Sequence, residues 1–445
     1  MSIPGLGQIP TAAAIPTTRT VTLRPAWEYR FTASFAEPLT IKLLSGTAEK
    51  DGVELAPRHA YVFRGTKTKI LTWQGCELEI DGRTEEENVR EYAQPTDNPA
   101  CAVLNIHGKL GELRAQGREG PRVLVTGPKD AGKTAVTRAL TSYATRQGFQ
   151  PLTVNVNPRE GMLSLPGTLS AAVFATIMDP ETGWGSTPTS GPSSTPVKLP
   201  LVYYYGREEA EEEPDFFKEI VGKLAGTVSG RLSEDEDVKR SGVFVDGFGV
   251  EERSEVGIDL IDHVVDEFSV NIIVVIGSSS LQAELERKYA NEKTSLGEPI
   301  NVVLVDKSDG AASRSETFIQ HEREAVIKEY FFGDARRTLS PQNQQVDFDS
   351  IVIYKAPDYK YEPDMAFSRQ EPSKELGHWA LAVTHSSLRD MPEVARSASV
   401  MGFVYVSDVD EEKRKVKVLA PVGGRLGDRP LIWGRWPEPY INLLG

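Results

Sequence analysis

Cysteine is almost absent from this chain of 445 residues, which contains only Cys76 and Cys101. Two cysteines cannot build a disulfide framework or a cysteine metal cluster, and such scarcity fits a reducing compartment, the cytosol or the nucleus. The six histidines show no metal-ligand spacing, since His378 and His385 lie seven residues apart without a nearby cysteine or further histidine. We therefore expect neither a disulfide scaffold nor a metal site of this kind.

Long hydrophobic runs are also missing. The longest apolar stretch, residues 270–277, is far too short to cross a bilayer. The first twenty residues lack a basic segment before an apolar core, and three prolines interrupt them. We therefore expect no secretory signal, no membrane association and a disordered segment over residues 1–16.

Positive charge is not in surplus, because the formal net charge is −14. The overall field cannot hold a polyanion, so RNA contact must be weak and local or come indirectly through a partner. Residues 413–417 are basic, but an acidic turn precedes them and Val418 and Leu419 follow. This pattern favours the solvated face of a strand over a nuclear localisation signal.

What the chain does contain is a complete phosphate-binding loop. Residues 121–134 read Pro-Arg-Val-Leu-Val-Thr-Gly-Pro-Lys-Asp-Ala-Gly-Lys-Thr, an apolar strand followed by Gly-x-x-x-x-Gly-Lys-Thr. Gly127 and Gly132 let backbone N–H groups surround phosphate oxygens, and the following helix adds its positive N-terminus. Lys133 supplies a charge for the β- and γ-phosphates, and Thr134 offers a hydroxyl to Mg²⁺. The predicted triphosphate contacts are Gly127, Pro128, Lys129, Asp130, Ala131, Gly132, Lys133, Thr134 and Ala135.

Three regions differ in their periodicity. Residues 17–100 form short alternating runs separated by turn residues, which predicts an N-terminal β-sandwich. Residues 101–334 alternate strands with helices, which predicts an α/β domain of the P-loop type, a parallel sheet covered by helices on both faces. Short strands return in residues 335–445 and predict a small C-terminal β-containing domain. The central strands are expected at 122–126, 152–156, 200–205, 242–246, 270–277 and 300–305.

The composition of two segments in the central region predicts loops. Residues 178–199 are rich in glycine, serine, threonine and proline, which predicts a long surface loop. Residues 208–213 are an acidic run, which we interpret as the solvated face of a loop.

Phosphoryl transfer needs more than a phosphate loop. It needs a carboxylate at a neighbouring strand end and a cation over the γ-phosphate. The strand at 152–156 offers only amides, Asn155 and Asn157, where a kinase would place its acid. The strand at 242–246 ends in Asp246, which either holds Mg²⁺ through water or begins a turn. Arg314 lies in a segment typical of a lid and either reaches the γ-phosphate or forms a surface ion pair.

These motifs occur in order with three others: residues 155–168, Lys-Glu-Tyr-Phe-Phe-Gly at 328–333 and Val-Gly-Gly-Arg-Leu at 422–426. Together they resemble the polynucleotide 5′-hydroxyl-kinase family, in particular its branch that serves as a subunit of the pre-mRNA cleavage and polyadenylation machinery. The resemblance covers essentially the whole chain and the same three-part layout. The insert around residues 183–186 is similar to that of the fungal members.

The resemblance implies further roles. In that family the N-terminal domain closes on the adenine, which implies contacts by Glu28 and Lys67; the bare sequence suggests only solvated strand residues. Active members carry an aspartate where this chain has Asn157, and Arg314 matches the first of their two lid arginines. The second falls near Ile319 or Gln320 here. Phe248 takes the place of a tryptophan of active members, and it could still stack a base although it lacks the indole N–H.

Three functions remain open. The first is a nuclear scaffold subunit that keeps ATP as a structural ligand between its N-terminal and central domains and lacks appreciable kinase activity. The resemblance implies a partner, the cleavage-factor subunit that carries a polymerase-tail-binding domain, besides other 3′-end processing subunits. The second is an active RNA 5′-hydroxyl kinase in which Asp246 and Arg314 compensate for Asn157. The third is a nucleotide switch with a lid that opens on hydrolysis.

Overall fold

The computed structural model describes residues 18–117, 119–188, 200–251, 253–311, 314–334, 336–357, 366–424, 426–439 and 443. Two compact units make up the chain, Met1–Lys50 with Glu54–Asn98 and Asp51–Val53 with Pro99–Gly445. The predicted disordered segment, residues 1–16, lies outside the described residues.

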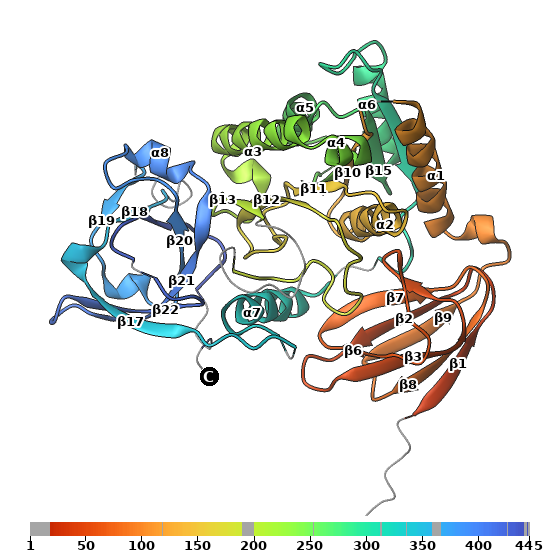
Figure 1. The fold of residues 1–445 in the computed structure, drawn as a ribbon, viewed down its shortest axis with the longest axis horizontal. Helices are drawn as coiled ribbons and strands as arrows, with labels where there is room; N and C mark the ends of the chain where they lie inside the picture. The colour runs from red at the N-terminus through yellow and green to blue at the C-terminus, as the bar shows by residue number, and fades with distance from the viewer. Residues whose placement is uncertain are drawn as a thin grey trace, which may run out of the picture. The chain divides into compact units, whose positions relative to one another are not determined.

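The first unit is a β-sandwich, as predicted (Figure 1). Its sheets have the strand orders β1-β8-β3-β6 and β5-β4-β7-β2-β9. Tyr29, Phe31 and Ala33 alternate along β2 into the core, because successive side chains of a strand point to opposite faces. Glu28 and Arg30 therefore face away from that core. The elements are β1 (Arg19–Leu23), β2 (Glu28–Ala33), β3 (Leu39–Gly46), β4 (Glu49–Lys50), β5 (Val53–Glu54), β6 (Ala60–Phe63), β7 (Thr66–Leu71), β8 (Cys76–Asp81), β9 (Glu86–Arg90) and η1 (Pro95–Asp97).

A seven-stranded sheet of order β13-β12-β11-β14-β10-β15-β16 forms the centre of the second unit. The strands β11, β14, β10, β15 and β16 are neighbours in this order and run parallel. β12 pairs antiparallel with β11, and β13 pairs antiparallel with β12, so within this sheet β12 alone runs in the opposite direction. The predicted strands are all present, but the sequence did not indicate β12. The strands are β10 (Arg122–Gly127), β11 (Leu152–Asn155), β12 (Thr168–Val173), β13 (Leu201–Tyr204), β14 (Val243–Gly249), β15 (Ile272–Ile276) and β16 (Asn301–Val305).

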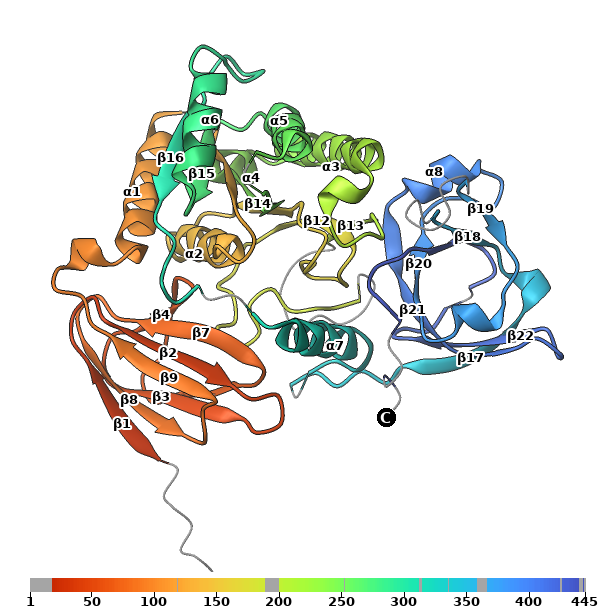
Figure 2. The same ribbon diagram turned by 180° about the vertical axis from the view of Figure 1, so that it is seen from behind.

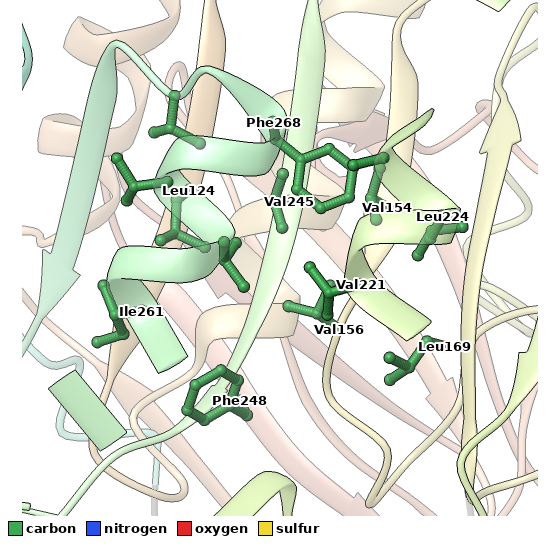
Figure 3. Close-up of a cluster of buried hydrophobic side chains, with 14 of the residues drawn as sticks. Leu124, Val154, Val156, Leu169, Val221, Leu224, Val245, Phe248, Ile261 and Phe268 are labelled. Carbon is green, nitrogen blue, oxygen red and sulfur yellow. The ribbon is translucent and has the colours of Figure 1, made fainter. Parts of the chain in front are cut away.

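Helices cover both faces of this sheet, which confirms the predicted α/β class (Figure 1). Val123 and Val125 of β10 pack against α1 and α2, whereas Leu124 packs with α3, α5 and α6 on the other face. Figure 3 shows this second cluster, in which Val221 and Leu224 of α3 meet sheet residues. The helices are α1 (Ala100–Gln116), α2 (Lys133–Arg146), η2 (Ala210–Glu212), α3 (Pro214–Glu234), α4 (Glu236–Ser241), α5 (Glu255–Phe268), α6 (Ser279–Tyr289) and α7 (Glu316–Phe332).

A second seven-stranded sheet, of order β17-β22-β21-β20-β23-β18-β19, follows α7 (Figure 2). Tyr330 and Phe331 of α7 pack against Phe403 and Tyr405 of β21, so α7 belongs to the core of this sheet. The basic segment at 413–417 leads into β22, as predicted for a strand face. The elements are β17 (Gln342–Asp347), η3 (Phe348–Ser350), β18 (Ile353–Lys355), β19 (Ser368–Gln370), η4 (Lys374–Leu376), β20 (Ala380–Thr384), α8 (Pro392–Arg396), β21 (Val400–Asp410), β22 (Lys415–Ala420) and β23 (Leu431–Trp433).

The prediction that residues 178–199 form a surface loop is wrong for residues 178–188, the part that the structure describes. Met178 and Trp184 are buried and pack with Met162, Leu163 and Phe174. Residues 189–199 lie outside the described residues. Within the described ranges, no helix combines the length and the apolar character that a membrane span requires.

Candidate nucleotide site

The phosphate loop joins β10 to α2 and has the backbone that its glycines allow. Gly127 has φ +147°, and a Cβ there would lie 2.5 Å from the carbonyl oxygen of Ile276 on β15. Gly132 has φ +94°, and a Cβ there would meet only the Cβ of Ala311, at 3.7 Å. Residues other than glycine rarely adopt backbone conformations with such positive φ angles. The loop therefore depends on both glycines, the first for close strand packing and the second for its own path into α2.

Lys133 occupies the first turn of α2 and is buried. Its ammonium donates to the carbonyl of Pro128 at 2.7 Å, within the loop itself. Burial lowers the pKa of Lys133, and the nearby carboxylates of Asp246, Glu160 and Asp130 act in the opposite direction. A lysine in the first turn of the helix that follows a glycine-rich loop is suited to bind phosphate oxygens.

Asp246 lies on β14, the strand between β10 and β11. It is buried, and burial raises its pKa to about 6 although Thr134 donates a hydrogen bond to it. Thr137 of α2 also lies near, with its hydroxyl 3.4 Å from the carboxylate. The structure thus brings together Thr134 and Asp246, the two residues predicted to hold Mg²⁺. A carboxylate and a hydroxyl beside a phosphate loop fit that ion, which binds few protein oxygens besides phosphates.

The amides at the end of β11 form turns of the backbone. Asn155 accepts from the backbone N–H of Asn157 and donates to the Asn157 carbonyl, each at 3.0 Å. The side-chain oxygen of Asn157 accepts from the N–H of Arg159 at 3.3 Å. These bonds are typical of asparagine in turns and give the amides a structural role.

Arg314 is bound by carboxylates from three separate segments. It pairs with Asp130 of the phosphate loop at 3.0 Å, with Glu322 of α7 at 2.9 Å, and with Glu160 after β11. Burial by itself raises the pKa of Glu160, but Arg314 lowers it below its usual value. Arg314 therefore lies beside the phosphate loop in a network of partly buried charges from three segments, which is more than a single surface ion pair.

Glu28 and Lys67 lie in the first unit, on β2 and β7. Glu28 is fully buried and pairs with Arg30 and Lys69, and Lys67 pairs with Glu86 at 3.2 Å. Lys67 is opposite Thr32 in the strand register, four residues along β2 from Glu28. The two side chains share one face of the sheet, about 13 Å apart.

Three further positions differ from the residues that active family members carry: Phe248, Ile319 and Gln320. Phe248 is buried in the hydrophobic cluster that Figure 3 shows. Its ring packs edge-on against Phe217, with ring centroids 5.4 Å apart. The suggestion that Phe248 could stack a base is therefore wrong, because its ring belongs to the core. Ile319 is buried in α7, and Gln320 is exposed and donates to Glu324.

The acidic run at 208–213 is not the solvated loop that we expected. Its Glu209 lies 2.9 Å from Lys129 of the phosphate loop, and its Glu208 lies 3.3 Å from Arg159. Glu213 is buried between Arg207 and Arg396. The run is therefore part of the wall beside the nucleotide site.

Comparisons with known proteins identify the family. A family model of the mRNA cleavage and polyadenylation factor CLP1 P-loop matches residues 127–333. Models of the N-terminal β-sandwich domain of polyadenylation factor and of the pre-mRNA cleavage complex II protein Clp1 match residues 22–117 and 339–438. An mRNA cleavage and polyadenylation factor CLP1 from Pyricularia oryzae is 49% identical, and one from Chaetomium globosum is 46% identical, each over the full length of both chains.

The chain belongs to the Clp1 family of mRNA cleavage and polyadenylation factors. Solved structures agree with this. Wild-type Clp1p in complex with a fragment of Pcf11p has a TM-score of 0.86 and 26% identity, over 95% of this chain and 99% of that chain. A second structure, of a Clp1p mutant with arginine in place of a glycine, concerns ATP loss and has a TM-score of 0.85 and 26% identity over 94% and 98% of the two chains. The resemblance inferred from the motifs is thus confirmed, and with it a nucleotide-binding P-loop domain.

Sequence reasoning missed Glu160, Glu322, Glu208 and Glu209 as neighbours of the site. Glu160 carried a weak signal, since it follows the end of β11 by a few residues, where parallel strands bring functional groups together. The other three come from α7 and from the turn after β13, and no local pattern places them at the phosphate loop.

Proposed function

We propose that this chain keeps ATP with Mg²⁺ as a structural ligand and serves as a scaffold subunit of the nuclear mRNA 3′-end cleavage and polyadenylation machinery. One contrast supports this proposal most strongly. Lys133, Thr134 and Asp246 converge on the phosphate loop, whereas the lid cation Arg314 is bound by three protein carboxylates. Such a pocket retains a triphosphate better than it transfers one, because transfer requires cations and acids directed at the reacting groups.

Each group of site residues would bind a different part of the ATP–Mg²⁺ ligand. The phosphate loop from Gly127 to Ala135 binds the phosphates, and Thr134 and Asp246 hold Mg²⁺. Arg314 closes the site as its lid, and Glu28 and Lys67 reach the adenine. Retained ATP then joins the first unit to the P-loop domain, and it adds stability that grows with the ATP concentration relative to Kd. We propose domain limits at 17–100, 101–334 and 335–445, which leave α7 at the end of the second domain, although its Tyr330 and Phe331 pack into the sheet of the third.

The partner would be the cleavage-factor subunit that carries a polymerase-tail-binding domain, together with other 3′-end processing subunits. The solved complex of Clp1p with Pcf11p supports a partner of this type. RNA contact by this chain would be indirect or weak, in keeping with its net charge of −14.

The nucleotide that remains after purification tests this proposal directly. Protein is passed through gel filtration, denatured, and its released nucleotide identified by mass spectrometry. We expect intact ATP at close to one equivalent. A pocket that is empty in fresh protein, or ATP that is converted to ADP without an acceptor, would contradict the structural role.

An active RNA 5′-hydroxyl kinase is the second candidate, and Glu160 favours it. This partly exposed carboxylate interacts electrostatically with Lys133 and lies on the segment that contains Asn157. Its pairing with Arg314 argues against a free base. Transfer of labelled γ-phosphate to a 5′-hydroxyl oligoribonucleotide, abolished by Lys133→Ala, would establish the kinase instead.

A further inference from the structure

The acidic turn after β13 has a fixed internal structure. The hydroxyl of Tyr205, a buried residue, donates to the carbonyl of Ala210 at 3.0 Å. The carboxylate of Glu212 accepts the backbone N–H groups of Glu208 at 3.0 Å and Glu209 at 2.8 Å. These bonds fix the backbone of the turn, so the side chains of Glu208 and Glu209 leave it in defined directions.

Both side chains meet cations at the edge of the nucleotide site. Glu209 lies 2.9 Å from the ammonium of Lys129 and 3.8 Å from the guanidinium of Arg159. Glu208 lies 3.3 Å from Arg159. Burial raises the pKa of Glu208, and the charges of Arg159 and Arg323 act in the opposite direction. Two cations, one from the phosphate loop and one from the segment after β11, thus face one pair of carboxylates.

We propose that Glu208 and Glu209 act as an internal substitute for phosphate groups, which masks Lys129 and Arg159 and keeps single-stranded RNA away from this wall of the pocket. Lysine and arginine side chains are the groups that bind the phosphates of a nucleic-acid backbone. A strand that approaches this wall must displace two carboxylates held on an ordered turn. The inference rests on the proposed function, in which ATP is kept without an acceptor strand.

The double variant Glu208→Gln/Glu209→Gln tests the masking. Glutamine keeps the size of the side chain and the backbone bonds of Glu212, and it removes both competing charges. We expect ATP-loaded variant protein to bind a 3′-labelled oligouridylate at least about tenfold more tightly than the wild type in fluorescence anisotropy. Between about 50 and 200 mM salt the slope of log K should steepen by roughly 1.4, about 0.7 for each of two new phosphate contacts.

The matched control is Glu234→Gln/Glu236→Gln, which removes the same charge from exposed positions. Glu234 ends α3, a helix of 21 residues that begins just after the acidic turn, so the control lies about 30 Å away. An equal gain in the control would assign the effect to net charge and overturn the proposal. Adding Arg159→Gln to the first variant should remove much of its gain, and an undiminished gain would overturn the proposal too.

Nucleotide content and melting temperature, measured on the same samples, separate this inference from the proposed function. Unchanged RNA affinity in folded, ATP-loaded variant protein overturns the masking and leaves the ATP scaffold in place. An empty pocket in the wild type contradicts the scaffold whatever the RNA result. If the double variant does not fold, the single variants should each give a smaller gain. Loss of a protein partner without a change in RNA affinity would assign the turn to a protein contact and overturn the masking.

Discussion

The nucleotide site has two halves that adjacent strands place side by side, and they differ in what their polar groups bind. In the phosphate half, Gly127–Thr134 with Asp246, the loop has the left-handed glycines of a phosphate-binding backbone, and Lys133, Thr134 and Asp246 lie close to one another. In the β11 half, Asn155–Glu160 with Arg314, the amides bind the backbone and the charges bind one another. Holding a triphosphate and transferring it are therefore separable, and the proposed scaffold role requires only the first.

The largest effect should come from breaking the phosphate half. Lys133→Ala/Thr134→Ala removes the charge for the phosphates and the hydroxyl beside Asp246, so we expect loss of ATP from the purified protein. If ATP normally stands at about 100 to 1,000 times its Kd, the free energy of unfolding falls by about 3 to 4 kcal/mol. Nucleotide content and urea unfolding measure both. Nucleotide-stripped wild type is the control, and unchanged stability of the variant would show that ATP does not stabilise the fold.

Arg314→Met tests whether the charges of the β11 half also support retention. It leaves Asp130, Glu160 and Glu322 without their shared cation, next to a bound polyanion. These side chains are 21–33% exposed, so solvent screens their charges, but the uncompensated carboxylates should still repel the phosphates. We therefore expect the Kd for ATP to rise by about tenfold, which corresponds to about 1.4 kcal/mol. Arg314→Lys keeps the charge and should lose less. Equal retention in both variants would mean that this network acts independently of the nucleotide.

Asp246→Asn should have opposite effects on the nucleotide-free and the ATP-loaded protein: it should stabilise the first and weaken ATP retention in the second. Burial raises the pKa of Asp246 from 3.8 to about 6, so between these pH values the folded state binds more protons than the unfolded state. The stability of nucleotide-free protein therefore falls as pH rises through this window. The variant has no carboxylate to ionise and so lacks this loss of stability. At pH 7.5 its free energy of unfolding should be higher than that of nucleotide-stripped wild type by about 1–3 kcal/mol, and below about pH 4 the two should not differ.

In the loaded protein the same substitution should weaken retention of ATP with Mg²⁺, because the amide carries no charge for the ion. Thermal unfolding with and without nucleotide measures both effects. Destabilisation of the stripped variant at pH 7.5 would show that the ionised carboxylate has favourable partners in the empty pocket.

The same contrast explains how far the sequence could predict this molecule. The phosphate half is local, because an eight-residue motif spans the end of a strand, a loop and the start of a helix. The sequence also marks Asp246, which follows a run of buried strand residues. The β11 half depends on distant partners, since Arg314 and Asp130 are 184 residues apart. Such pairs leave no periodicity or spacing in the sequence, so the role of Arg314 stayed open.

Burial limited the other predictions. Charge runs and turn-rich segments usually face solvent, yet the acidic run forms the wall of the site and Trp184 is buried. The strand β12 was missed because it follows a turn-rich segment, with Gly167 at φ +85° directly before it. Phe248 is an error of the opposite kind, because a residue that was expected to contact a ligand belongs to the hydrophobic core.

The smallest effect should come from restoring one acid to the β11 half. Asn157→Asp supplies the carboxylate of active family members, but its oxygen would still accept the N–H of Arg159, as the amide does at 3.3 Å. Arg314 would also stay bound to its three carboxylates. We therefore expect transfer of labelled phosphate to a 5′-hydroxyl oligoribonucleotide to remain undetectable, with an active family member as the positive control. Transfer by this single variant would mean that only the acid was missing, and that the internal bonds of the β11 half yield readily to an acceptor.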